Sequence, residues 1–146
     1  MRRLRFLSGF MFSAVMLLAG IFVWFQFRNQ NIHATPPAIL LACIASPIVS
    51  ALLGWCLAPI YVSRRKVAAI LFASFVIVVA TAFTTAGLYM VASNAVRGAP
   101  LFAHLSGRYA VDYAITYISV GCLIWVPGLI TIAFLLARAS ARVVHS

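Results

Sequence analysis

Few side chains in this chain could do chemistry, and most of those are hydroxyls. Asp112 is the only acidic residue among 146, so the paired carboxylates of general acid–base catalysis are missing. The histidines, His33, His104 and His145, lie outside the long apolar runs. They supply neither a metal cage nor two axial haem ligands inside a membrane. We therefore expect no enzyme, no metal site and no cofactor.

One apolar run, residues 67–92, carries three threonines in its second half and a serine two turns before them. The hydroxyl-bearing residues of interest are Ser74, Thr81, Thr84 and Thr85. Hydroxyls in membrane helices mostly bond back to a carbonyl of their own helix or across to a neighbouring helix, which is the structural interpretation. The alternative interpretation is that these residues line a polar path for a transported molecule.

Asp112 also admits two interpretations. It stands at the predicted start of the last apolar run, four residues after Arg108. A carboxylate there interacts favourably with the helix dipole and with a guanidinium one turn away. In the functional alternative, Asp112 and Arg108 form an external contact with a charged group on a ligand or partner.

Small residues recur every four positions in the run 38–61, which contains no charged residue. Positions four apart share one helical face, and small residues let membrane helices approach closely. The resulting small-residue strip consists of Ala42, Ser46, Ser50, Gly54 and Ala58. We predict that it is a helix-packing surface, and that Gly121 and Gly128 form a second one on the last run.

Two prolines inside the apolar runs predict bent helices. Pro47 has no backbone N–H, so it leaves one carbonyl of its helix unpaired. Ser46 or Ser50 is placed to donate to that carbonyl, since membrane helices tolerate proline when a neighbour satisfies the freed group. Pro127 beside Gly128 predicts a kink in the last run.

The elements that must position these residues are four apolar runs, each long enough to cross a bilayer. They span residues 6–27, 38–61, 67–92 and 112–137. The chain is 65% hydrophobic and 8% charged, whereas soluble domains are about 45–50% apolar and about 25% charged. We predict one all-α domain over residues 1–146, an integral membrane bundle of four transmembrane helices.

The net charge of +10 gives no reason to expect nucleic acid as a partner. The distribution of the cations along the chain instead indicates how the protein is oriented in the membrane. Of the 11 Lys and Arg residues, eight lie at the N-terminus, in the turn 63–66 and in the tail. The other side carries only Arg28, Arg97 and Arg108. Because loops rich in Lys and Arg stay cytoplasmic, we predict both termini inside. Ten Arg against one Lys suggests a GC-rich genome and hence a bacterial inner membrane.

These observations favour a small non-enzymatic membrane protein. The small-residue strip indicates an accessory or assembly subunit that packs against helices of a membrane partner, or against a second copy, within membrane lipids. The alternative is a small oligomeric transporter or lipid-carrier subunit. It is supported by the hydroxyl-rich run and by the prolines, since bent or broken helices often line binding sites in transporters.

Overall fold

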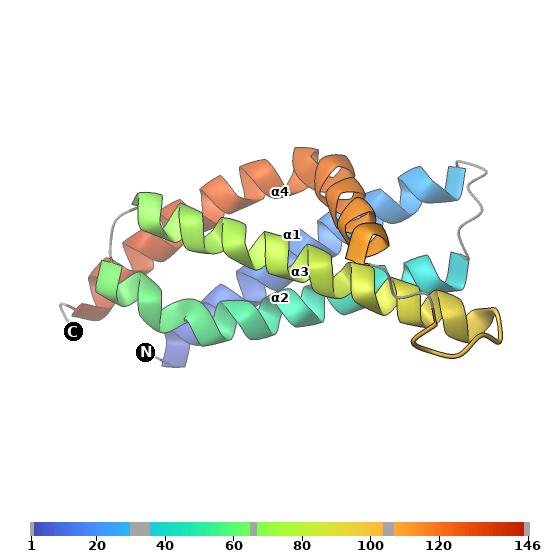
Figure 1. Cartoon of the computed structure of the whole chain (residues 1–146). Helices are drawn as coiled ribbons and strands as arrows, with labels where there is room; N and C mark the ends of the chain where they lie inside the picture. The colour runs from blue at the N-terminus through green and yellow to red at the C-terminus, as the bar shows by residue number, and fades with distance from the viewer. Residues whose placement is uncertain (1, 30–35, 65–66, 104–106, 145–146) are drawn as a thin grey trace.

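The computed structural model describes residues 2–29, 36–64, 67–103 and 107–144. Its helices are α1 (Arg2–Asn29), α2 (Pro36–Arg64), α3 (Val67–Val96) and α4 (Gly107–Val144), and the described residues contain no strand (Figure 1). All four helices are long and apolar enough to cross a membrane. The predicted all-α bundle of four transmembrane helices is therefore confirmed.

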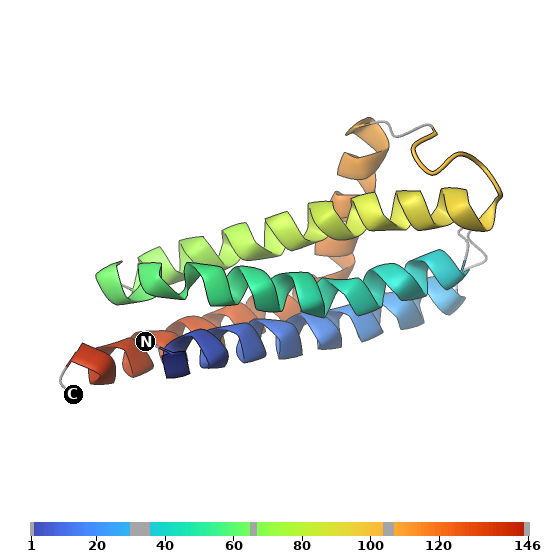
Figure 2. The ribbon, with the colours of Figure 1, turned by 90° about the horizontal axis from the view of Figure 1, so that it is seen from below.

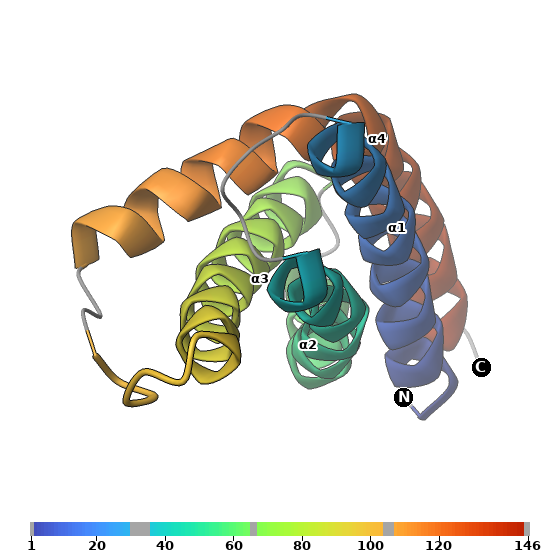
Figure 3. The ribbon, with the colours of Figure 1, turned by 90° about the vertical axis from the view of Figure 1, so that its right-hand side faces the viewer.

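The helices follow one another around the bundle. Each packs against the next in sequence, and α4 closes the ring by packing on α1. The most extensive pairing joins α1 and α2, while α2 and α4 also meet across one diagonal. Figure 3 shows this arrangement along the bundle, and Figure 1 shows both termini at the same end. A ring of this kind places α2 beside α1, so the small-residue strip has a neighbour within the chain.

The end of α3 is set by a glycine in the left-handed region. Gly98 has φ 67°, a conformation that glycine adopts without steric cost. The N–H of Ala99 donates to the carbonyl of Asn94 (3.0 Å), and the N–H of Gly98 donates to that of Ala95 (3.2 Å). These two bonds form a Schellman motif, which satisfies the last carbonyls of the helix.

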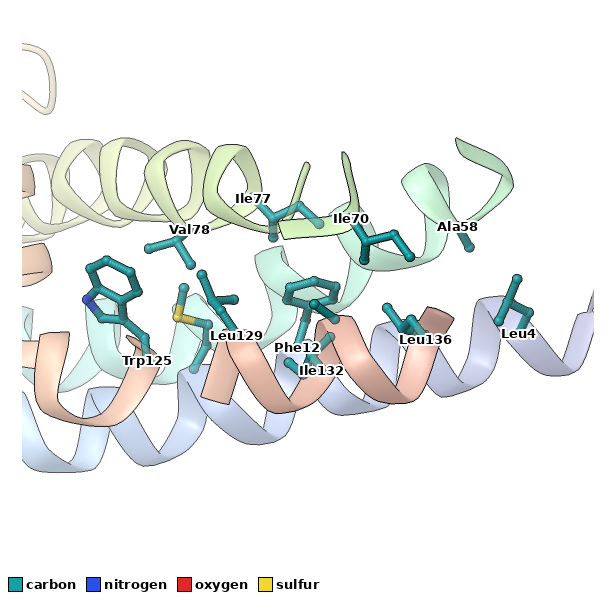
Figure 4. Close-up of a cluster of buried hydrophobic side chains, with 12 residues drawn as sticks. Leu4, Phe12, Ala58, Ile70, Ile77, Val78, Trp125, Leu129, Ile132 and Leu136 are labelled. Atoms are coloured by element: carbon teal, nitrogen blue, oxygen red, sulfur yellow. The ribbon is translucent and has the colours of Figure 1, made fainter. Parts of the chain in front are cut away.

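The apolar core fills the half of the bundle nearer the termini. It contains Phe12 and Leu4 of α1, Ile77 of α3 and Leu129 and Leu136 of α4, all buried (Figure 4). Most of the other large apolar side chains on the four helices are exposed. In a bilayer this outward surface meets lipid, so the distribution fits a membrane bundle.

A sharp bend divides α4 (Figures 1 and 2). Pro127 lies inside this helix and removes the N–H that would bond the carbonyl four residues earlier. On the N-terminal side of Pro127, the indole Nε1 of Trp125 donates to the carbonyl of Ile118 at 2.8 Å. Gly121 lies between those two residues, and an added Cβ there would be 3.4 Å from Trp125 Cδ1. The predicted kink is thus present, and the indole packs over Gly121.

Candidate functional site

The small-residue strip of α2 is buried, and its central residues pack against α1 of the same chain. All five residues are buried, and Gly54 lies in close contact with α1. A Cβ added at Gly54 would lie 2.8 Å from Phe12 Cδ2 and 3.1 Å from the carbonyl oxygen of Ser8. The strip is therefore an internal packing surface of this bundle, and it offers no exposed surface to another protein.

One serine hydroxyl donates across this interface, and two more approach carbonyls of the facing helix at successive turns while making shorter bonds to their own helix. Ser8 Oγ donates to the carbonyl of Gly54 at 2.8 Å. One turn further, Ser50 Oγ lies 3.3 Å from the carbonyl of Phe12, and the next turn brings Ser46 Oγ to 3.5 Å from the carbonyl of Met16. Each step moves four residues forward in α1 and four back in α2, as two antiparallel helices in fixed register require.

Two glycines of α1 complete the close approach. A Cβ at Gly9 would lie 3.0 Å from the carbonyl oxygen of Ala51, and one at Gly20 would lie 3.1 Å from that of Cys43. The four-residue pattern of small residues in α2 does not by itself indicate these two glycines as its partners. Their spacing of 11 residues, about three turns, keeps them on one face and is the signal that could have identified them.

Ser46 joins three helices. Its Oγ donates to the carbonyl of Cys43 at 3.1 Å, which is the carbonyl that Pro47 leaves without a backbone donor. The same oxygen accepts a hydrogen bond from the hydroxyl of Tyr117 in α4 at 3.1 Å. The expected repair of the Pro47 defect is therefore present, and it also ties α4 to the α1–α2 interface.

Of the four α3 residues predicted as a possible polar path, two bond to their own helix. Ser74 is buried, and its Oγ donates to the carbonyl of Ile70 at 2.7 Å. Thr84 faces outward, and its Oγ1 donates to the carbonyl of Ala80 at 2.8 Å. Both follow the usual back-bonding of hydroxyls in membrane helices. Thr84 lies on the lipid side of α3, away from the interior of the bundle.

Thr81 and Thr85 behave differently. Their side chains are 0% and 3% exposed, yet neither Oγ1 has a hydrogen-bond partner among the described residues. They lie one turn apart on the buried face of α3. The same stretch of α3 carries Ala82 and Ala86, which pack in one cluster with Tyr117. The structure thus places the two free hydroxyls at the level of the Ser46–Tyr117 bond.

The surroundings of this hydroxyl pair are uncharged. The cluster at its level contains Val23, Cys43, Ala114 and Tyr117, and no described group of three or more His, Cys, Asp or Glu residues could hold a metal ion. A charged ligand buried here would lack a counter-charge, which is very costly in a low-dielectric interior. The arrangement suits an uncharged polar group.

Asp112 and Arg108 lie on the outside of α4. Both are exposed, and no ion pair joins them in the part of the chain that the structure describes. Because α4 begins at Gly107, well before the predicted start of this span, Asp112 belongs to the second turn of the helix. The helix dipole acts mainly on the first turn, so the predicted dipole interaction is weaker than the sequence indicated.

Gly121 and Gly128 both lie where α4 meets α1. A Cβ at Gly128 would be 2.7 Å from Val15 Cγ1, and one at Gly121 would be 3.7 Å from the Cβ of Ala19. These contacts place both glycines at the α1–α4 interface. They lie apart from the hydroxyl pair of α3 and have a packing role.

Comparison of the chain with protein-family models, with curated proteins and with solved structures gives no match.

Proposed function

We propose that this protein is a small membrane carrier subunit that binds an uncharged polar group inside its helix bundle. The observation that supports this function is the pair of buried, unpartnered hydroxyls of Thr81 and Thr85. An unpaired buried polar group costs about 1–3 kcal/mol, and such groups are rare in proteins and often functional. A ligand that hydrogen-bonds to the pair would recover that free energy.

The back-bonded hydroxyl next to the pair strengthens this argument. A threonine in a helix can satisfy its own hydroxyl by bonding to the carbonyl one turn earlier. Thr84, beside Thr85, does so at 2.8 Å, and Thr116 and Thr131 of α4 do the same. Only the inward-facing Thr81 and Thr85 leave the hydroxyl free among the threonines of the described helices. The threonine hydroxyls without a partner are therefore the ones that face the interior of the bundle.

The bent helix α4 supplies the moving part of this carrier. Tyr117 lies on the N-terminal side of the bend and bonds to Ser46 of α2, while Gly121 and Pro127 give the helix a weak point. Movement of residues 107–120 about this bend would separate Tyr117 from the cluster and admit a ligand. Bent helices beside a central site are common in transporters.

Transport by reconstituted protein tests this function. Purified protein is reconstituted into phosphatidylcholine–phosphatidylglycerol vesicles. One assay measures glycerol flux by light scattering, and the other measures the transbilayer movement of a fluorescent diacylglycerol. We expect one of the two rates to rise at least fivefold over empty vesicles. Thr85→Val should abolish the increase, and Thr84→Val, its lipid-facing neighbour, should retain it. Equal rates with and without protein for both probes would reject the carrier function.

The accessory or assembly subunit is a second candidate, and the lipid side of α3 favours it. A Cβ added at Gly87 would meet no atom within 4 Å, and Thr84 nearby is exposed. Glycine inside a helix costs about 1 kcal/mol relative to Ala, and small residues on a lipid face permit close approach of another helix. For this function, Gly87→Leu should remove a partner or second copy that co-purifies in mild detergent, without lowering the thermal midpoint. Retention of that partner by Gly87→Leu would reject this surface.

A further inference from the structure

We infer that Thr81 and Thr85 together bind one uncharged oxygen of the ligand, a hydroxyl or carbonyl oxygen, which accepts a hydrogen bond from both. This inference deepens the proposed carrier function by naming the group that the interior site recognises. It rests on the unpartnered state of the two buried hydroxyls and on their separation by one turn of α3. Its test is arranged so that binding and transport can fail separately.

The spacing of the two threonines fits a single bridging atom. Residues four apart in a helix are separated by about 6 Å along the axis. Two hydrogen bonds of about 2.8 Å that meet at one oxygen along its lone-pair directions span about 5 Å, and a small rotation of the two side chains about χ1 closes the remaining distance of about 1 Å. One oxygen midway between the hydroxyls therefore satisfies both, without any other polar group on the ligand.

The hydrogen-bonding capacity of the pair selects the ligand chemistry. Each threonine supplies one O–H donor, so the pair offers two donors to a shared acceptor. The hydroxyl oxygens can also accept hydrogen bonds from an ammonium group, but that group would bring a full positive charge into an uncharged cluster. A carboxylate would accept both donors but brings a full negative charge into a cluster whose charged partners are missing, at a high desolvation cost. Neutral hydroxyl and carbonyl oxygens meet both requirements.

Such an oxygen has two sources, a molecule dissolved in the bilayer or a solute from water. The experiment uses 1-decanol for the first source and glycerol for the second, with 1-decanethiol as the matched probe because sulfur accepts hydrogen bonds only weakly. The same detergent is used for every probe and every variant, so that the acceptor oxygens of its headgroup contribute equally to all measurements. The measurement is the midpoint of thermal aggregation against probe concentration.

We expect the midpoint of thermal aggregation to rise saturably by at least 3 °C with 1-decanol or with glycerol, and by less than a third of that amount with 1-decanethiol. Thr81→Val and Thr85→Val should each remove the rise, Thr81→Ser should keep it, and Thr84→Val should match the parent. The midpoint of each variant without probe shows that it is folded. The active probe identifies the source of the ligand.

Three results would overturn the inference: an equal rise with the thiol, a rise that persists in both valine variants, or no rise with either oxygen probe. The carrier function is judged separately by vesicle transport. A threonine-dependent rise in the aggregation midpoint without transport would support the binding site and reject the carrier function. Transport that is unchanged by both valine substitutions would support the carrier function and reject this binding site.

Discussion

Individual hydroxyl groups of this protein fall into three classes according to their partners. Ser8, Ser46 and Ser50 lie at the α1–α2 interface and approach carbonyls of the facing helix. Ser74 and Thr84 bond to their own helix, whereas Thr81 and Thr85 have no partner among the described residues. The same functional group thus bonds to the protein in one place and is left without a partner in another, and substitutions distinguish the two cases.

Removing a hydroxyl should change stability in opposite directions in two of these classes. Ser8→Ala loses the 2.8 Å bond to Gly54 and should lower the free energy of unfolding by about 0.6–2 kcal/mol, the usual value between membrane helices. Thr81→Val replaces an unpartnered hydroxyl by a methyl of similar size, which should leave stability unchanged or raise it. Unfolding in mixed micelles measures both. A loss for Thr81→Val as large as that for Ser8→Ala would show that Thr81 has a structural partner.

Gly54→Leu should destabilise the bundle strongly. Even a Cβ at this position would be 2.8 Å from Phe12, and the Ser8 backbone lies behind it, so α1 and α2 must separate. Dispersion contacts fall steeply with separation, and overpacking typically costs about 1–3 kcal/mol or more. Thermal aggregation in mild detergent measures the loss.

The matched control for Gly54→Leu is Leu52→Ile, because Leu52 is exposed to lipid. Leu53 is less suitable, since it is partly buried against the main apolar cluster. We expect Leu52→Ile to match the parent. A parent-like midpoint for Gly54→Leu would mean that α1 does not pack on this face.

At the scale of the helices, sequence periodicity identified the elements but could not say which face met which neighbour. The apolar runs predicted all four helices, and the small-residue strip is indeed buried. The strip did not reveal that its partner is α1 of the same chain, because close packing within a chain and between chains uses the same residues. Thr84 and Thr85 were likewise indistinguishable, since adjacent hydroxyls differ only in the direction each faces.

We expect the bond between Trp125 and Ile118 to help fix the bend of α4. Trp125→Phe keeps a ring near Phe75, whose centroid lies 6.4 Å away, but it removes the indole donor. We expect a wider distribution of distances between spin labels at positions 112 and 141, together with a lower thermal midpoint. Trp55→Phe is the control, because Trp55 contacts Phe6 edge to face. An unchanged distribution would show that Pro127 and Gly121 alone set the bend.

At the scale of the whole molecule, the positions of the cations agree with an antiparallel four-helix bundle. The described cations Arg2, Arg3 and Arg142 are exposed near the termini, which share one end (Figure 1). Arg97 follows the last residue of α3, Arg108 lies in the first turn of α4, and both are exposed. The charge asymmetry read from the sequence is therefore also an asymmetry between the two ends of the fold.

This asymmetry predicts which end faces the cytoplasm. Reporter fusions after Lys66 and at the C-terminus should be cytoplasmic, and fusions after Gln30 and Gly98 should be external, because segments rich in Lys and Arg resist transfer across the membrane. Replacing Arg2, Arg3 and Arg5 by Asn should weaken this preference and give a mixed population, whereas the same change at Arg97, on the external side, should not. An external C-terminus in the parent would reverse the assignment, since four spans require both termini to lie on one side.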